Sequence, residues 1–345
     1  MEATKTELEL LESLYEGRKP VYGEVHDHSS CGDGKYPLMH WRGAMQALRI
    51  DFAAILDHRQ VEHMYHPDWE DGVFLGGTEP GTKISDSKAE VAQMHYNMIF
   101  EGPRPLEELL EAFPEFEFTG APDGRFNYPK FTTARMQELI AYIQSHGGVF
   151  VHPHPKQLMR SEDPLDYWFA DGTGIEIVTN GIESQQTRDN YALYQALLAK
   201  GKRVWGFAGG DYHACATDSS ISTIYAREKK NAAYLEALCV GDFTAGGVGI
   251  RMCVGGTRMG GSTAFVGKQL IVSAGDFHRS VGNPEHRYLL EVHSDRGVEA
   301  SVEFSCPEGT TLSLLAEDRD FYRTTVTDIN RNLILAYGNP IWNDR

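Results

Sequence analysis

The sequence predicts an α/β protein: a seven-stranded, TIM-like βα barrel followed by an all-β, sandwich-like region. Before residue 210, short apolar runs alternate with segments of helical periodicity, as strands and helices do in parallel βα units. After about residue 245, short alternating segments are separated by turn residues. The length of 345 residues suits this arrangement, because it allows about two domains of roughly 150 residues each.

Seven apolar runs are the predicted barrel strands. They span residues 21–25, 52–56, 73–75, 96–100, 149–151, 175–178 and 204–207. The clearest helix lies at 133–146, where Thr132 or Thr133 can cap its beginning and Gly147 follows its end. A second helix is predicted at 188–200, where apolar residues recur at the same spacing.

The predicted strands of the all-β region are short and separated by Gly, Asn, Asp and Pro. They span residues 269–273, 288–293, 298–304, 311–315, 322–326 and 333–337. Such spacing is typical of an antiparallel sandwich. We therefore predict two domains, a barrel over 1–244 and an all-β domain over 245–345. The second domain could cover the barrel mouth, select substrate or form the interface of a homo-oligomer.

The composition narrows the classes of partner. Lys and Arg total 32 against 49 Asp and Glu, a net charge of −17, which argues against a long nucleic acid as partner. There is no run of ~18 apolar residues, so we expect no membrane span. The five cysteines are odd in number and show no CxxC spacing, which favours a reduced, cytoplasmic protein.

Histidines and carboxylates gather directly after five of the predicted strands. The chain has 14 histidines, and 11 of them precede residue 245. The residues that follow these strands are His26 and His28, Asp57 and His58, Glu79, His152 and His154, and Asp211 and His213. The C-terminal ends of barrel strands meet at one mouth, so these side chains should converge. Because such a cluster is costly to bury unpaired, the pattern predicts a metal site.

Several short motifs occur in a fixed order over about residues 20–240. They are His26-x-His28, the SCGDG stretch at 30–34, LDH at 56–58, GTE at 77–79, His154-Pro155 after a Gly pair, and GD-x-H at 210–213. In this order they resemble the motifs of the PHP (polymerase and histidinol phosphatase) family. The chain's ending is similar to that of longer members with an extra β domain. The resemblance implies a distorted seven-stranded barrel that holds two or three divalent metal ions and hydrolyses phosphoesters.

The resemblance also implies how the ligands are shared among the ions. His26, His28, Glu79 and Asp211 would hold the first ion, Glu79, His95 and His154 the second, and Asp33, His58 and His213 the third. His95 differs from the other ligands because it precedes its apolar run. His152 competes with His154, and the family's spacing favours His154. Asp57 is either a ligand or a residue that orients His58, and we favour the latter.

Water activation explains why such residues would be grouped. A bound divalent cation can lower the pKa of water from about 15.7 to about 7. A carboxylate such as Glu79 can bridge two ions, which then hold the nucleophile and the developing oxyanion together. Imidazole and carboxylate ligands suit zinc, manganese or iron and do not choose among them.

Three cationic residues near the predicted mouth are candidates for binding an anionic substrate: Arg59, Lys156 and Arg160. A guanidinium can hold a phosphate through two parallel hydrogen bonds, although each of the three fits a solvated surface charge equally well. The sequence therefore predicts a metal-dependent hydrolase of phosphoesters in a small molecule or short nucleotide.

Two alternatives remain open at the level of sequence. One is hydrolysis of a carboxylic ester, amide or carbamate at the same metals, which a second phosphate-binding cation would argue against. The other is a metal-bearing binding module, against which the near-complete ligand set speaks. A second D-x-H pair, Asp276 and His278, lies in the all-β region without neighbouring ligand motifs, and we expect it to bind no metal.

Overall fold

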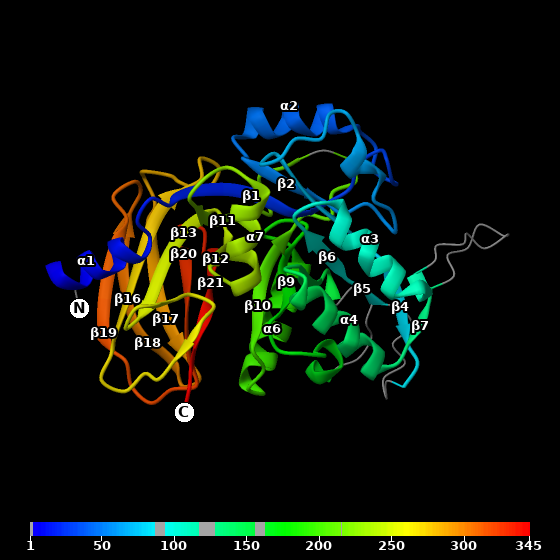
Figure 1. Cartoon of the computed structure of the whole chain (residues 1–345). Coiled ribbons are helices and arrows are strands. Elements are labelled where there is room, and N and C mark those ends of the chain that lie inside the picture. Colours follow the sequence, from blue (N-terminus) through cyan, green and yellow to red (C-terminus); the bar gives the residue numbers. More distant parts are fainter. Residues whose placement is uncertain (1–2, 87–93, 117–127, 156–162, 215) are drawn as a thin grey trace.

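All seven predicted barrel strands form, and they lie side by side in one sheet in chain order (Figure 1). The computed structural model describes residues 3–345 except 87–93, 117–127, 156–162 and 215. The strands are β1 (Lys19–Asp27), β2 (Phe52–Ile55), β3 (Phe74–Thr78), β6 (Asn97–Phe100), β8 (Val149–His152), β9 (Thr173–Thr179) and β10 (Val204–Gly209). Their buried apolar side chains share one hydrophobic core with those of the helices α3 (Pro103–Ala112), α4 (Thr133–Ser145), α6 (Gln185–Ala199) and α7 (Asn231–Val240).

One strand runs against the others. The pairs β1/β2, β2/β3, β8/β9 and β9/β10 are parallel, whereas β6 is antiparallel to both β3 and β8. The parallel arrangement predicted for all seven runs is therefore wrong at β6. A parallel neighbour needs a long crossover, usually a helix. Between β3 and β6 the described chain instead forms two short strands, β4 (Gly81–Ile84) and β5 (Met94–His95).

The first and last strands of this row, β1 and β10, come together only at their C-terminal ends. Beyond β10, the backbone N–H of Asp211 donates to the carbonyl of His26 at 2.8 Å, and that of His28 donates to the carbonyl of Tyr212 at 3.0 Å. The first half of β1 pairs with β11 (Ser222–Ala226) on the same side. Among the described residues no continuous ladder joins β10 to β1, so strand pairing does not show a closed barrel.

Local capping explains where the predicted helices begin. The described helices are α1 (Lys5–Leu14), α2 (Leu38–Leu48), α3 (Pro103–Ala112), α4 (Thr133–Ser145), α6 (Gln185–Ala199) and α7 (Asn231–Val240). The predicted helix at 133–146 is α4, which Thr132 caps by accepting a hydrogen bond from the N–H of Arg135 at 3.1 Å. The second predicted helix begins earlier than expected, because Ser184 caps α6 by accepting from Thr187 at 3.0 Å.

The large sheet continues from β1 into the C-terminal region. Beyond β11 it contains β12 (Phe243–Gly246), β21 (Leu333–Asn343), β20 (Phe321–Asp328), β17 (Arg287–Ser294) and β18 (Gly297–Ser305). The predicted boundary at 244/245 lies within β12, which pairs with β11 on one side and β21 on the other. The sheet therefore crosses this position without a break.

A second sheet faces this extension. It contains β14 (Thr257–Arg258), β13 (Val248–Val254), β16 (Gln269–Phe277) and β19 (Thr310–Leu315). Side chains from both sheets, including Ile250, Val272, Leu290 and Val326, share a separate apolar core. The predicted sandwich is thus present, but one of its sheets is shared with the barrel strands. Within the described part of the chain, no helix has the length and apolar character needed to cross a membrane.

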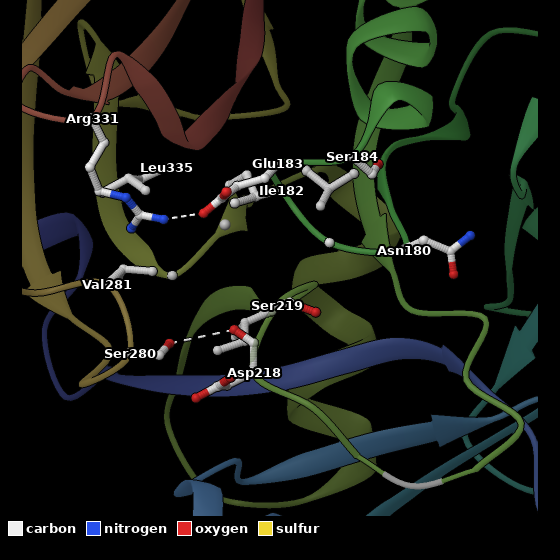
Figure 2. Close-up of a pocket in the computed structure, with 15 residues that line it drawn as sticks. Asn180, Ile182, Glu183, Ser184, Asp218, Ser219, Ser280, Val281, Arg331 and Leu335 are labelled. Carbon is white, nitrogen blue, oxygen red and sulfur yellow. Dashed lines mark hydrogen bonds and ion pairs between the residues drawn. The ribbon is translucent and has the colours of Figure 1, made fainter.

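A cavity of about 300 Å³ lies between the barrel strands and the C-terminal region (Figure 2). Its wall combines the loop after β9 with residues of the C-terminal strands and turns. Arg331 and Glu183 form an ion pair there, and the Ser280 hydroxyl donates to the carbonyl of Asp218 at 3.4 Å. None of the predicted metal ligands lines this cavity.

Candidate metal centre

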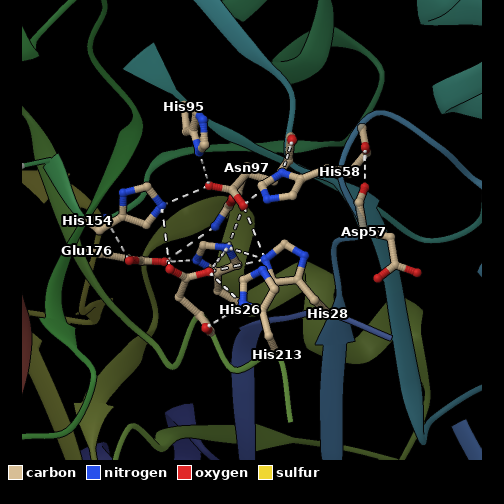
Figure 3. Close-up of polar contacts among 12 residues, drawn as sticks. His26, His28, Asp57, His58, His95, Asn97, His154, Glu176 and His213 are labelled. Carbon is tan, nitrogen blue, oxygen red and sulfur yellow. Dashed lines mark hydrogen bonds and ion pairs between the residues drawn. The ribbon is translucent and has the colours of Figure 1, made fainter. Parts of the chain in front are cut away.

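The predicted ligands converge at one end of the barrel strands (Figure 3). His26 and His28 lie at the end of β1, His58 follows β2, Glu79 follows β3, His154 follows β8, and Asp211 and His213 follow β10. Because β6 is antiparallel to both β3 and β8, the strands on its two sides run in the same direction. The C-terminal ends of these five strands therefore share one edge of the sheet. Asp33 reaches the same place from the loop after β1.

The reversed direction of β6 explains the position of His95. His95 lies on β5, just before β6 begins. Because β6 is antiparallel to β3 and β8, its beginning lies beside the ends of those strands. The ring of His95 therefore reaches Glu79, with its Nδ1 atom 2.8 Å from Oε1 of the carboxylate. A candidate ligand that precedes its strand thus meets candidate ligands that follow theirs.

Four buried or nearly buried side chains form what we call the inner group: His26, His28, Glu79 and Asp211. The Nε2 atoms of His26 and His28 lie 3.1 and 3.2 Å from Oε2 of Glu79. Nε2 of His28 is also 3.2 Å from Oδ1 of Asp211. The side chains of His26, His28 and Glu79 are 0% exposed, and that of Asp211 is 17% exposed. These donor atoms therefore surround one point that is largely closed to solvent.

A more exposed set, the outer group, consists of Asp33, His58 and His213. The Nε2 atoms of His58 and His213 lie 3.7 and 3.4 Å from Oδ2 of Asp33. Their Nδ1 atoms lie 2.9 Å from the Glu79 carbonyl and 3.0 Å from the Asp211 carbonyl, respectively. A carbonyl can only accept, so each Nδ1 donates its proton. In the neutral ring, each Nε2 then has a lone pair that can bind a metal ion.

The third set, the side group, is Glu79, His95 and His154. Oε1 of Glu79 lies 2.8 Å from Nδ1 of His95 and 2.9 Å from Nε2 of His154. Oε2 of the same carboxylate faces the inner group. The two oxygens of Glu79 thus face different sets of imidazoles, as a carboxylate that bridges two ions requires.

The donor atoms fit divalent metal ions. Nε2 of His26 and Nε2 of His28 are 3.2 Å apart, which is close to the separation of two nitrogens that each lie about 2.1 Å from one zinc ion. Burial opposes ionisation of Glu79, but His26 and the other imidazoles around it outweigh this and hold its pKa well below the usual range. Imidazole and carboxylate donors suit zinc, manganese and iron alike.

Sequence reasoning missed Glu176, which lies behind the inner group. Glu176 is on β9 and is 1% exposed, and its Oε1 atom lies 2.6 Å from Nδ1 of His26. Its Oε2 atom accepts a hydrogen bond from the backbone N–H of His154 at 2.8 Å. A carboxylate on one ring nitrogen orients the other toward a metal. The signal was present in the sequence, since Glu176 is the one charged residue of the run 175–178.

The structure gives Asp57 a different contact from the one we expected. Its carboxylate accepts from the backbone N–H of Ser29 at 2.5 Å and from the Ser29 hydroxyl at 2.6 Å. Figure 3 shows it turned away from the imidazole cluster. Asp57 therefore fixes the loop between His28 and Asp33 and does not orient His58 as predicted.

The competition between His152 and His154 is decided by position. His154 reaches Glu79, whereas His152 packs between the rings of Phe150 and Phe169. Burial lowers the pKa of His152 to about 3, so it stays neutral in its apolar surroundings. The structure thus places His154 in the cluster and His152 in the core.

One of the three predicted cationic residues can be placed. Arg59 directly follows His58, is half-buried, and has its guanidinium carbon 5.6 Å from the centre of the Tyr128 ring. Lys156 and Arg160 lie outside the described residues. The Asp of the second D-x-H pair has a different partner: Asp276 accepts from the hydroxyl of Tyr225 at 2.8 Å.

No protein-family model and no curated protein matches the chain. A two-domain protein from Bacteroides vulgatus that contains a predicted PHP-like metal-dependent phosphoesterase is similar over 94% of this chain and 96% of its own, with 12% identity and a TM-score of 0.42. An amidohydrolase from Chromobacterium violaceum, with bound sulfate and no metal, is similar over 56% of this chain and 87% of its own, with 17% identity and a TM-score of 0.38. These likenesses are distant, so the function has to be inferred from the side chains themselves.

Proposed function

We propose that this protein is a metal-dependent hydrolase of the PHP type, which cleaves phosphoester bonds in a small molecule or short nucleotide at a di- or trinuclear centre. One observation carries the proposal. Five imidazole rings, those of His26, His28, His58, His95 and His154, place a nitrogen between 2.8 and 3.3 Å from the buried carboxylate of Glu79. Burying so many polar groups around one charge costs free energy, which a purely structural core would avoid.

The side chains have separate tasks in this mechanism. Divalent ions bound here would supply hydroxide at neutral pH and positive charge for the phosphoryl oxygens. Glu79 bridges the inner and side groups, and Asp211 adds a second carboxylate that balances the charge of a dication. Glu176 accepts the Nδ1 proton of His26 in a hydrogen bond, so that the lone pair of Nε2 can bind a metal ion at the centre.

The exposure of the ligands indicates where a substrate arrives. The side chains of Asp33 and His213 are 53% and 38% exposed, whereas those of His26, His28 and Glu79 are 0% exposed. A substrate therefore meets the outer group first, and the inner group lies behind it. The net charge of −17 disfavours a long nucleic acid, so a compact anion is the better fit.

Hydrolysis assays on the metal-loaded protein test this proposal. The substrates are phosphomonoesters, phosphodiesters and carboxylic esters, each assayed with zinc, manganese or iron resupplied. We expect phosphoester hydrolysis that disappears on chelation and returns with metal. Hydrolysis of carboxylic esters alone would contradict the phosphoester assignment and favour the carboxylic ester, amide or carbamate alternative. Absence of all hydrolysis by fully loaded protein would contradict an enzyme.

A further inference from the structure

Arg59 has an unusual backbone beside the outer group. It directly follows His58, and its φ angle is +54°, in the left-handed region that non-glycine residues rarely adopt. Such conformations persist where the surroundings fix them, and they are frequent at ligand sites. The side chain of Arg59 is half-buried. Its side chain begins directly beside His58, a member of the outer group.

Tyr128 forms a platform for this guanidinium. The Arg59 guanidinium carbon lies 5.6 Å from the centre of the Tyr128 ring, within the range of a cation–π contact. The same ring lies 6.1 Å from the ring of His95, a member of the side group. Gly81, which pairs with His95 across β4 and β5, leaves the space for it, because a Cβ at position 81 would collide with the Tyr128 ring. Tyr128 thus lies within reach of both the Arg59 guanidinium and a ring of the side group.

We propose that Arg59 and Tyr128 form an anion clamp that selects a terminal phosphate, so that the substrate is a phosphomonoester. This inference rests on the proposed function and names its substrate class. A planar guanidinium donates two parallel N–H groups to two oxygens of one phosphate. A monoester has three terminal oxygens, enough for the guanidinium and the metal centre together. A diester has only two, which the metal centre itself would use.

Phosphate binding tests the clamp apart from catalysis. Inorganic phosphate is titrated calorimetrically into the metal-loaded protein and into the variants Arg59→Ala, Tyr128→Phe and Tyr128→Leu. We expect Arg59→Ala to weaken phosphate binding at least ~10-fold, the scale of a lost charged hydrogen bond. Tyr128→Leu should weaken it roughly threefold, and Tyr128→Phe should leave it unchanged, because the ring alone supports the guanidinium. Metal content should stay the same in all variants.

Two controls separate the clamp from a general effect on structure. Lys202 lies over Trp168, with its Nζ atom 3.8 Å from the ring centre, and neither residue contributes to the metal centre. Trp168→Leu removes a cation–π contact there and should leave phosphate affinity unchanged. In the Arg59→Ala background, Tyr128→Leu should have no further effect, because its action passes through Arg59. An equal effect in both backgrounds would overturn the role of Tyr128.

Substrate preference gives the second readout. The ratio of kcat/KM for a phosphomonoester to that for a phosphodiester should fall at least ~10-fold in Arg59→Ala. An unchanged phosphate affinity in Arg59→Ala would overturn the clamp, even if the wild-type protein hydrolyses phosphoesters. If the wild type hydrolyses none but its phosphate affinity depends on Arg59, the proposed function fails and the clamp stands as an anion site.

Discussion

Two D-x-H pairs in this protein share their spacing and their backbone conformation, yet they have different surroundings. Asp211 and Asp276 have φ angles of 52° and 49°. Oδ1 of Asp211 lies 3.2 Å from Nε2 of His28, and His213 joins the outer group. Asp276 accepts from a tyrosine, and His278 bonds to Ser280 at 2.8 Å. Local sequence and local conformation therefore do not define a metal site.

The direction of the neighbouring strands accounts for the difference. Asp211 follows β10, whose end lies at the same edge as the ends of β9 and β8, because these strands are parallel. Asp276 lies near the end of β16, whose neighbours β13 and β19 are both antiparallel to it. The ends of antiparallel neighbours lie at opposite edges. Side chains at the end of β16 therefore do not meet those at the ends of β13 and β19, and no ligand cluster forms.

The largest effect is expected at Asp211. Asparagine keeps the shape of the side chain but removes a charge that balances a dication. Asp211→Asn should lower metal content and reduce hydrolysis at least ~10²-fold, the scale of a lost essential electrostatic contact. Asp276→Asn is the matched control, with both quantities within about twofold of wild type. If Asp211→Asn were fully active and Asp276→Asn bound no metal, the metal site would have to lie in the C-terminal region.

The next effect concerns the residue behind His26. Glu176→Gln removes a charge but keeps an oxygen that can accept from His26, so it should weaken metal binding roughly 10- to 100-fold without removing the site. Competition with a chelator of known affinity measures this. Glu303→Gln, at a side chain that is 57% exposed and paired with Arg287, is the control. Equal metal affinity in Glu176→Gln and wild type would show that Glu176 does not support the inner group.

A smaller effect is expected at Asp33. Its side chain is 53% exposed, so solvent screens its charge more than that of buried Glu79. Asp33→Asn should weaken the most loosely bound ion by about tenfold and leave the inner group loaded. Native mass spectrometry during stepwise chelation should then show one ion leaving earlier than in wild type. Simultaneous loss of all ions would contradict separate inner and outer groups.

The smallest effect is expected on the stability of the C-terminal pair. Asn at position 276 retains an oxygen that can accept from the Tyr225 hydroxyl, so Asp276→Asn should change the free energy of unfolding by less than about 0.5 kcal/mol. Denaturant unfolding measures this. A larger loss would mean that the charge of Asp276 has a structural role that its surroundings do not indicate.

Much of the architecture could be predicted because it depends on local sequence. Apolar runs located the strands of the first sheet segment, and the residues that follow them located the cluster of candidate ligands. The direction of β6 could not be predicted, because it depends on the connection before the strand and not on its own residues. The pairing of β1 with β11 is a contact between residues about 200 positions apart, for which no local pattern exists.

The candidate ligands could be predicted from motifs at the strand ends, whereas the supporting carboxylate of Glu176, which lies within β9, was missed. Glu176 lies within a strand. A single charged residue in an apolar run does not change the prediction of a strand, so it gives no clear sign of a functional role. His154 was distinguished from His152 only by family spacing, because both lie near the same strand end. The structure separates them by the side to which each ring points, toward Glu79 or toward Phe169.

The metal content of the purified protein tests the centre most directly. Nine ligand candidates in three groups, two of which share Glu79, exceed what one ion can use, so elemental analysis should find more than one divalent ion per chain. The measurement is made on protein as purified and again after metal is resupplied and the excess removed. A content of one ion or fewer per chain in both samples would contradict the multinuclear centre.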